Sequence, residues 1–176
     1  MLTGDKVTLR PLDKRDYPAL YRFRNDVVIT ILGDDEPPVP RTYEAFSSFM
    51  DELAKKDDGV MFVIEADGKA IGSVGLFHFD RTSGTCELGI FIGEHDYLGK
   101  GYGTEAVRLS VEYAFRYHNL HKVYLQVTAD NERAIASYKK CGFVEEGRLR
   151  QQLWSDGVYK DVIPMGILSS EISAKS

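Results

Sequence analysis

Short runs in which apolar and polar residues alternate recur along the 176-residue chain, and each run predicts a β-strand. The first run is Val7–Leu12. Two further runs, Val60–Ala66 and Lys69–Phe77, are joined by Asp67-Gly68, a dipeptide typical of tight hairpin turns. Thr85–Ile92 also reads as a strand. The middle of the chain is therefore predicted to hold three consecutive strands, the first two of them paired as a hairpin.

Apolar residues at helical spacing predict helices before and after these strands. Asp13 is suited to cap a first helix over Tyr17–Phe23, and a second helix is predicted over Thr42–Gly59. The prolines in segment 33–40 exclude a helix there, because proline lacks an N–H and clashes with the preceding turn. Tyr102–Tyr117 is apolar over a wide arc and is predicted to be a helix packed on a sheet.

The C-terminal part predicts a strand over Lys122–Thr128, a helix over Asn131–Lys140 that ends at Gly142, and a hairpin from Phe143 that turns at 155–157. The predicted order is β-α-α-β-β-β-α-β-α-β-β, with a β-α-β crossover only in the middle. This order indicates a mixed α/β (α+β) fold: one mixed, mostly antiparallel sheet with helices on both faces. We expect a single domain over residues 1–176.

Composition narrows the possible partners. Hydrophobic residues make up 43% and charged residues 28% of the chain, as in ordinary globular proteins. The formal net charge is −5 and no basic cluster is present, so nucleic acid is not an expected partner. No apolar run approaches the ~18 residues needed to span a bilayer. We therefore expect no membrane partner and a cytoplasmic location.

Cysteine and histidine usage predicts no metal site. Cys86 and Cys141 are expected to be reduced thiols, although they could in principle pair. The four histidines do not form a zinc-binding pattern with them.

The glycine-rich segment 98–104 lies between a predicted strand and the longest predicted helix. Glycine lets a ligand approach the backbone closely, and the first N–H groups of a helix attract anions. The segment therefore predicts a phosphate or pyrophosphate site, formed by Leu98, Gly99, Lys100, Gly101, Tyr102, Gly103 and Thr104. The alternative is that the glycines only shape a loop.

Two other nucleotide-binding motifs also place glycines in such a segment. A Walker P-loop is excluded, because the Gly-Lys-Ser/Thr triplet is missing. Gly101–Ala106 fits the G-x-G-x-x-A pattern of dinucleotide-binding folds. Its place in mid-chain, with too little chain after it for two nucleotide-binding halves, argues against that fold.

The glycine-rich segment and Asn131–Phe143 together resemble the two motifs of the GNAT superfamily, Q/R-x-x-G-x-G/A and N-x-x-A-x-x-x-Y-x-K-x-G-F. The resemblance extends from Thr8 to Asp161, and the flanks resemble the branch of ribosomal-protein alanine acetyltransferases and spermidine acetyltransferases. It implies a GNAT-like acyl-CoA N-acyltransferase fold, with acetyl-CoA as co-substrate and no metal. Leu98 departs from the usual Gln or Arg, and Ser137 replaces a usually apolar residue, for which we expect only a packing adjustment.

The resemblance also implies roles for individual residues. Glu87 is the candidate general base; its alternative reading is a solvated or ion-paired strand carboxylate. Tyr138 is the candidate general acid that protonates the departing thiolate, or else a core tyrosine. Asn131 would hydrogen-bond an arm of the cofactor.

Backbone groups in the strand before the glycine-rich segment would pair with pantetheine and polarise the thioester; they belong to Ile90, Phe91 and Ile92. The amine would attack directly in a ternary complex. Cys86 is disfavoured as a nucleophile, because no histidine is near it in sequence and it lies beside the carboxylate of Glu87.

Segments 25–41 and 151–159 are expected to shape acceptor specificity. Asp34, Asp35 and Glu36 would attract a cationic amine, or would simply be solvated. The leading expectation is a protein N-terminal acceptor of the ribosomal-protein type. The alternatives are a spermidine, polyamine or other small-amine acetyltransferase, and a non-catalytic acetyl-CoA-binding module. A homodimer, paired through an open edge of the C-terminal hairpin, is left open.

Overall fold

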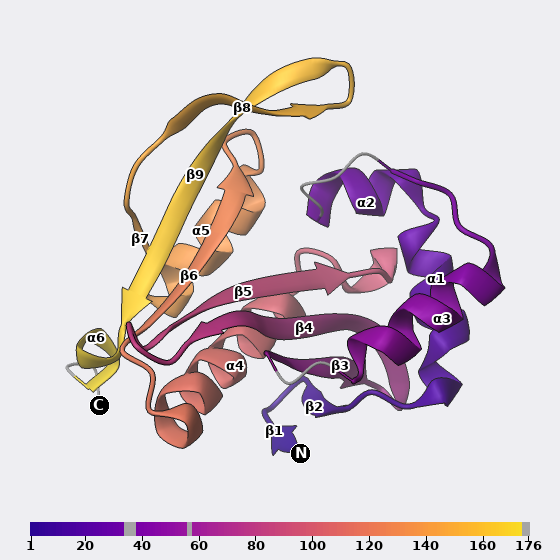
Figure 1. Ribbon diagram of the computed structural model, residues 1–176, viewed down its shortest axis with the longest axis horizontal. Helices are drawn as coiled ribbons and strands as arrows, with labels where there is room; N and C mark the ends of the chain where they lie inside the picture. Colours follow the sequence, from indigo (N-terminus) through magenta and orange to yellow (C-terminus); the bar gives the residue numbers. More distant parts are fainter. Residues whose placement is uncertain (34–37, 56–57, 174–176) are drawn as a thin grey trace.

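The computed structural model describes residues 1–33, 38–55 and 58–173, which form a nine-stranded sheet in the order β1-β2-β3-β4-β5-β6-β9-β7, with β8 also paired to β9 (Figure 1). The strands are β1 (Leu2–Thr3), β2 (Thr8–Pro11), β3 (Val60–Ala66), β4 (Lys69–Asp80), β5 (Thr85–Ile92), β6 (Lys122–Thr128), β7 (Val144–Glu145), β8 (Leu149–Ser155) and β9 (Val158–Leu168). The helices are α1 (Tyr17–Arg24), α2 (Val27–Gly33), α3 (Tyr43–Leu53), α4 (Tyr102–His118), α5 (Glu132–Cys141) and α6 (Ser169–Ser173), with short 3-10 turns η1 (Lys14–Asp16) and η2 (His95–Tyr97).

Strand pairing confirms the mixed, mostly antiparallel sheet. Among the described strands, β5 and β6 form the one parallel pair, and α4 is the crossover between them. Their register holds for only three pairs, from Thr85–Lys122 to Glu87–Tyr124. Beyond these pairs the two strands separate, β5 following β4 and β6 following β9 (Figure 1).

Helices cover both faces of the sheet, as predicted. On one face α4 buries Val107, Val111 and Ala114 against the inward side chains of the central strands. The residues recur at i, i+4 and i+7, which keeps them on one side of the helix. On the other face α1, α2 and α3 enclose a smaller cluster with Phe23, Phe46 and other apolar residues. None of the described helices is long and apolar enough to cross a bilayer.

Several elements differ from the sequence-based prediction. The helix expected to reach Gly59 ends at Leu53, while β4 continues past Phe77 through a shift of register to Asp80. Helix α2 was not predicted at all. The side chain of Asp26 accepts hydrogen bonds from the N–H groups of Val28 and Ile29 and so starts α2 in a β-branched stretch that favours strands. Strand β1 and helix α6 were also missed, and the first strand of the hairpin expected from Phe143 is divided into β7 and β8.

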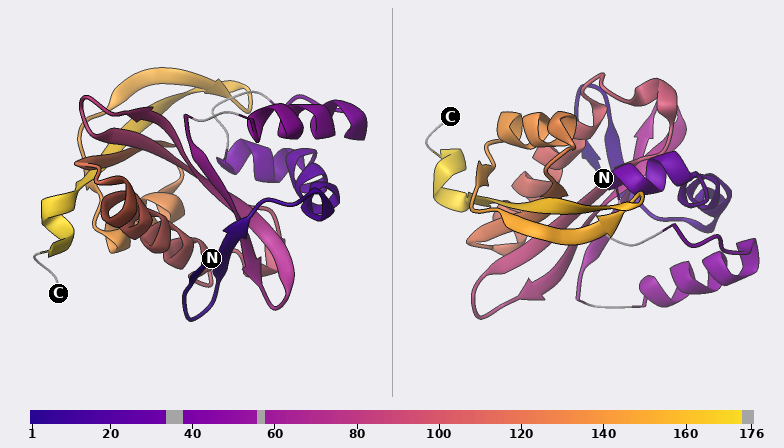
Figure 2. Two further views of the ribbon diagram at one scale, coloured as in Figure 1. Left: turned by 60° about the horizontal axis from the view of Figure 1, so that its bottom comes forward. Right: turned by 90° about the horizontal axis from the view of Figure 1, so that it is seen from above.

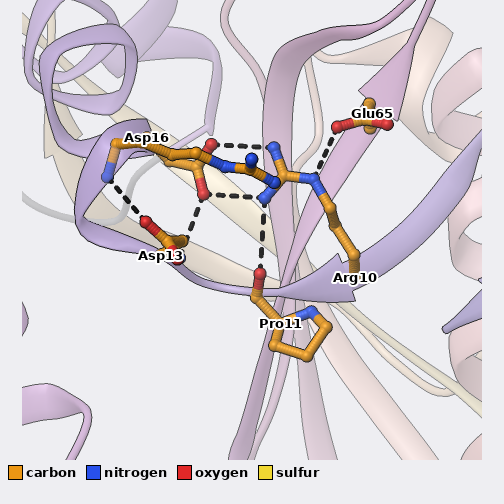
Figure 3. Close-up of polar contacts among 6 residues, drawn as sticks. Arg10, Pro11, Asp13, Asp16 and Glu65 are labelled. Atoms are coloured by element: carbon orange, nitrogen blue, oxygen red, sulfur yellow. Dashed lines mark hydrogen bonds and ion pairs between the residues drawn. The ribbon is translucent and has the colours of Figure 1, made fainter.

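A buried ion-pair network joins β2, η1 and β3 (Figure 3). The guanidinium of Arg10 donates two hydrogen bonds of 2.8 Å to the carboxylate of Asp16 and one of 2.6 Å to Glu65. Asp16 is 4% exposed and Arg10 is 8% exposed. Burial by itself raises the pKa of Asp16, but the hydrogen bond from Arg10 and another from the N–H of Asp13 hold that pKa below its usual value. The network fixes the start of α1 against the sheet.

We predict that Arg10→Met lowers the free energy of unfolding by about 3–5 kcal/mol, because it leaves the Asp16 carboxylate buried without its cation. Urea unfolding at neutral pH measures the change. Arg116→Met removes an exposed cation 3.6 Å from Glu112 and serves as the control with little expected effect. A loss no larger for Arg10→Met than for the control would contradict the stabilising role of the network.

Candidate active site

A cavity of about 290 Å3 lies where β5 and β6 separate. Its wall combines the end of β5, the glycine-rich segment, the start of α4, the end of β6 and one side of α5. Of the residues predicted for the site, those in the wall are Ile90, Phe91, Ile92, Leu98, Gly99, Gly103, Thr104, Asn131 and Tyr138. The structure therefore brings together two motifs that are separated by about thirty residues of chain.

The edge of β5 that faces the cavity has no strand partner beyond its three pairs with β6, within the described residues. Gly93, directly after β5, donates its N–H to the carbonyl of Ile71 in β4 at 2.9 Å. Successive N–H groups of a strand point to opposite edges, so the N–H of Phe91 also faces β4. The N–H groups of Ile90 and Ile92 face the cavity, where an extended ligand would pair with them.

The glycine-rich segment forms a turn with two left-handed residues, Gly99 at φ 72° and Gly101 at φ 89°. Gly101 is the N-cap of α4 and supplies no side chain to bind the first N–H groups of this 17-residue helix. Those N–H groups are therefore available to an anion, and Gly103 and Thr104 from the first turn lie in the cavity wall.

The other half of the turn faces the N-terminal segment of the chain. The ammonium of Lys6 donates to the carbonyl of Lys100 at 2.9 Å and lies 5.6 Å from the ring centre of Tyr102. Lys100, Gly101 and Tyr102 are not among the residues that line the cavity. Their predicted contact with a ligand stays a prediction, and their observed contacts support the turn.

Glu105, in the first turn of α4, ties this helix start to the loop between β1 and β2. Its carboxylate accepts hydrogen bonds from the N–H groups of Asp5, Lys6 and Val7 at 2.9, 2.7 and 2.8 Å. Burial by itself raises the pKa of Glu105, but these three donors outweigh it and lower the pKa. The ionised carboxylate of Glu105 therefore faces the loop between β1 and β2.

Helix α5 presents the second motif to the cavity. The side-chain oxygen of Asn131 accepts a hydrogen bond from the N–H of Ala134 and caps the helix. The ring centres of Tyr138 and Phe143 are 5.9 Å apart, and the side chain of Tyr138 packs on the main core. The hydroxyl of Ser137 lies 2.7 Å from that of Thr104, so this residue joins α5 to α4 by a hydrogen bond. The expectation of a mere packing adjustment at Ser137 was therefore incomplete.

Sequence reasoning missed several residues of the cavity wall. Arg133 and Lys140 contribute cationic side chains from α5, and Ile29 and Ile31 contribute apolar side chains from α2. The two cations are seven residues apart, a spacing that places them on one face of a helix and that the sequence alone displays. The isoleucines could not be found in this way, because α2 itself was not predicted.

Glu87 is not among the residues that line the cavity. It lies in the last pair between β5 and β6, opposite Tyr124, where the two strands begin to separate. Its side chain is 23% exposed and one carboxylate oxygen lies 2.9 Å from Nδ1 of His78. The carboxylate is thus held at the point where the strands separate, and its role as general base stays a prediction.

Both cysteines are free thiols in the structure. Burial raises the pKa of Cys86 to about 12 and that of Cys141 to about 11, so neither is a thiolate at neutral pH. This agrees with the expectation that Cys86 is not a nucleophile. Over the described part of the chain, no three His, Cys, Asp or Glu side chains form a group that could hold a metal ion.

Residues 6–144 match the family described as "Acetyltransferase (GNAT) domain". The chain belongs to the GNAT acetyltransferase family. Spermidine N(1)-acetyltransferase of Escherichia coli (strain K12) is 33% identical over 178 residues, covering 99% of this chain and 92% of that protein.

Solved structures of spermidine N-acetyltransferase from Vibrio cholerae have the same fold. The complex of that protein with CoA and spermine has a TM-score of 0.88 and 30% identity, over 96% of this chain and 98% of that one. A dodecameric structure in an intermediate state has a TM-score of 0.84 and 29% identity, over 98% and 99% of the two chains. The expected GNAT fold and acetyltransferase activity are confirmed.

The first segment expected to shape acceptor specificity contains α2, and the second lies in the β8–β9 hairpin. The β8–β9 hairpin, which contains residues 151–159, reaches from the sheet toward α2 in both ribbon figures (Figures 1 and 2). Asp34, Asp35 and Glu36, expected to attract a cationic amine, lie outside the described residues.

We predict that Gly99→Ala weakens acetyl-CoA binding at least about tenfold, because the added methyl group would keep the expected ligand from approaching the backbone of this cavity-lining residue closely. Gly157→Ala, in the β8–β9 turn, is a matched control. Its φ is 76° against 72° at Gly99, and an added Cβ meets no atom within 4 Å at either position.

Both glycine variants should lose about 1–2 kcal/mol of unfolding free energy, because alanine is strained in the left-handed region. Calorimetric titration with acetyl-CoA measures the affinity. Equal affinities for the two variants would contradict the placement of the ligand at this turn.

Proposed function

We propose that this GNAT acetyltransferase transfers the acetyl group of acetyl-CoA directly to a primary amine of a polyamine such as spermidine. The observation that carries the choice of acceptor is the match with spermidine N(1)-acetyltransferase over 99% of this chain. A related structure, with a TM-score of 0.88, contains CoA and spermine. These similarities favour the polyamine alternative over the protein N-terminus that the sequence led us to expect first. The net charge of −5 also favours a cationic acceptor.

The cavity wall carries groups that suit the chemistry of acetyl-CoA. Ile90 and Ile92 would pair their backbone N–H groups with the pantetheine amides, as an added strand does. The start of α4, at Gly103 and Thr104, would hold the pyrophosphate. Arg133 and Lys140 in the cavity wall supply positive charge for the remaining phosphate. When bound there, acetyl-CoA supplies the activated thioester.

The chemistry requires a base for the amine, and an acid assists the departure of the thiolate. A primary amine with a pKa of about 10.4 costs about 4.6 kcal/mol to deprotonate at neutral pH. Glu87 would accept the proton, directly or through water, from the place where the strands separate. As the C–N bond forms and the C–S bond breaks, the hydroxyl of Tyr138 would donate its proton to the departing sulfur.

The remaining alternatives have less support. The non-catalytic binding module has no observation in its favour, because both the fold and the family are those of acetyltransferases. Association between copies stays a prediction. Strand β8 pairs only with β9 among the described strands, so its outer edge is available to a second copy.

We predict that Tyr138→Phe lowers kcat at least about 100-fold and leaves the Kd for acetyl-CoA within about twofold, because only the proton donor is removed while the ring stays. Stopped assays of free thiol release give kcat, and calorimetry gives the Kd. Tyr124→Phe is the control that removes a tyrosine hydroxyl outside the cavity wall. An unchanged kcat for Tyr138→Phe would contradict the proposal that Tyr138 is the general acid.

We predict that spermidine and spermine are acetylated with kcat/KM at least about 100-fold above that of peptides with N-terminal Ala or Ser. The panel also includes an amino sugar and an aminoglycoside, at equal amine concentration, with thiol release as the readout. A preference for the peptides would overturn the polyamine proposal and would favour a protein N-terminal acceptor of the ribosomal-protein type. Thiol release without an acceptor is the blank.

A further inference from the structure

An irregularity in β4 places a histidine beside the candidate base. The register between β4 and β5 shifts between Phe77 and Asp80, which is a β-bulge. Within it, His78 has a φ of 51°, in the left-handed region that residues with a Cβ rarely adopt. Bulges redirect a side chain from its regular place in the sheet. Here the redirected ring lies with Nδ1 2.9 Å from Oε2 of Glu87.

The two partners differ sharply in their access to solvent. The side chain of Glu87 is 23% exposed, whereas that of His78 is 70% exposed. The pair therefore has one member held in the sheet, where the strands separate, and one member in water. An imidazole that contacts a carboxylate through Nδ1 and is mostly exposed to solvent can take a proton on Nδ1 and release one from Nε2.

Other ionisable groups around Glu87 are poorly suited to taking a proton from it and releasing one to water. Tyr124 lies opposite Glu87 on β6, and burial, followed by the negative charge of Glu87, raises its pKa. Burial raises the pKa of the adjacent Cys86 thiol to about 12. Asp80 accepts hydrogen bonds from the N–H groups of Thr82 and Ser83, which lower its pKa. Tyrosine and thiol thus keep their protons and Asp80 stays ionised at neutral pH.

Proton balance requires an exit from the site. An acceptor ammonium carries three N–H protons and the product amide retains one, so two protons leave the nitrogen in each turnover. One of them replaces the proton that Tyr138 gives to the CoA sulfur, and the other must reach solvent. This count rests on the proposed function, which is acetyl transfer to an amine. The proposed base, Glu87, is the group that receives the proton.

We propose that His78 carries this second proton from Glu87 to solvent. Glu87 accepts the proton from the amine nitrogen and passes a proton from Oε2 to Nδ1 of His78, and Nε2 releases one to water. Tautomer exchange through water returns the ring to its starting form. His78 acts through Glu87 and does not touch the substrate, so it is a positioning residue. The bulge and its left-handed residue hold the ring at the carboxylate.

The test uses two substitutions that suit the observed backbone. Glycine adopts a φ of 51° without strain, so His78→Gly removes the ring and should fold normally. Asparagine also tolerates this region and can hydrogen-bond to Glu87, but it cannot carry a proton. Asn119→Gly, at another residue with a φ of 51° in the C-cap of α4, is the control for glycine at such a position.

Steady-state kinetics with acetyl-CoA and spermidine, or with whichever amine of the panel the wild type acetylates fastest, should separate the roles. We expect kcat to fall at least about tenfold in both His78 variants, with both KM values within about twofold and Asn119→Gly unchanged. Imidazole added to the assay should restore most of the kcat of His78→Gly and none of that of His78→Asn, whose side chain occupies the space.

A second comparison separates failure of the relay from failure of the proposed base. Glu87→Gln should lower kcat on its own, and adding His78→Gly to it should cost nothing further, because the two residues act in one path. Full activity of Glu87→Gln would overturn the base and the relay together. A slow Glu87→Gln with a fully active His78→Gly, or a slow His78→Gly that imidazole does not rescue, would overturn the relay alone.

Discussion

The separation of β5 from β6 is the constraint on which the site depends. Each strand is held by an antiparallel neighbour, β5 by β4 and β6 by β9, while the two share only three residue pairs. A sheet edge left open inside a protein is normally a liability, because its N–H and C=O groups lack partners. Here the open edge of β5 forms one wall of the cavity, so the same defect that interrupts the sheet provides the groups for an extended ligand.

Contacts distant in sequence keep the start of α4 in place beside that opening. Glu105 binds three consecutive N–H groups of the N-terminal loop, and Gly4 in that loop leaves room for it, since a Cβ there would lie 2.6 Å from the carboxyl carbon. Arg10, in the strand that follows this loop, forms an ion pair with Asp16 and so holds the start of α1. Ser137 joins α4 to α5 through the hydroxyl of Thr104. Both cavity-forming helices are therefore fixed to the rest of the fold by polar contacts as well as by packing.

The sequence predicted those parts whose signals are local. Helix α4 and the hairpin β3–β4 follow from periodicity and from one turn dipeptide, and α5 from its terminal glycine. Helix α2 was missed because its β-branched residues favour strands and only the capping aspartate, Asp26, marks its start. The strand separation, the bulge at His78 and the Thr104–Ser137 contact depend on how distant segments pack, and no spacing along the chain displays them. The motifs located the cavity, whereas the position of Glu87 beside His78 required the structure.

We propose that acetyl-CoA binds along the open edge of β5 and the start of α4. Amide hydrogen exchange followed by NMR, with and without acetyl-CoA, tests it most directly, because each backbone N–H reports on its own partner. We expect the ligand to slow exchange at Ile90, Ile92, Gly103 and Thr104 and to leave Trp154 and Tyr159 unchanged, because neither of these two hairpin residues lines the cavity. Binding of acetyl-CoA with no slowing at those four amides would contradict it.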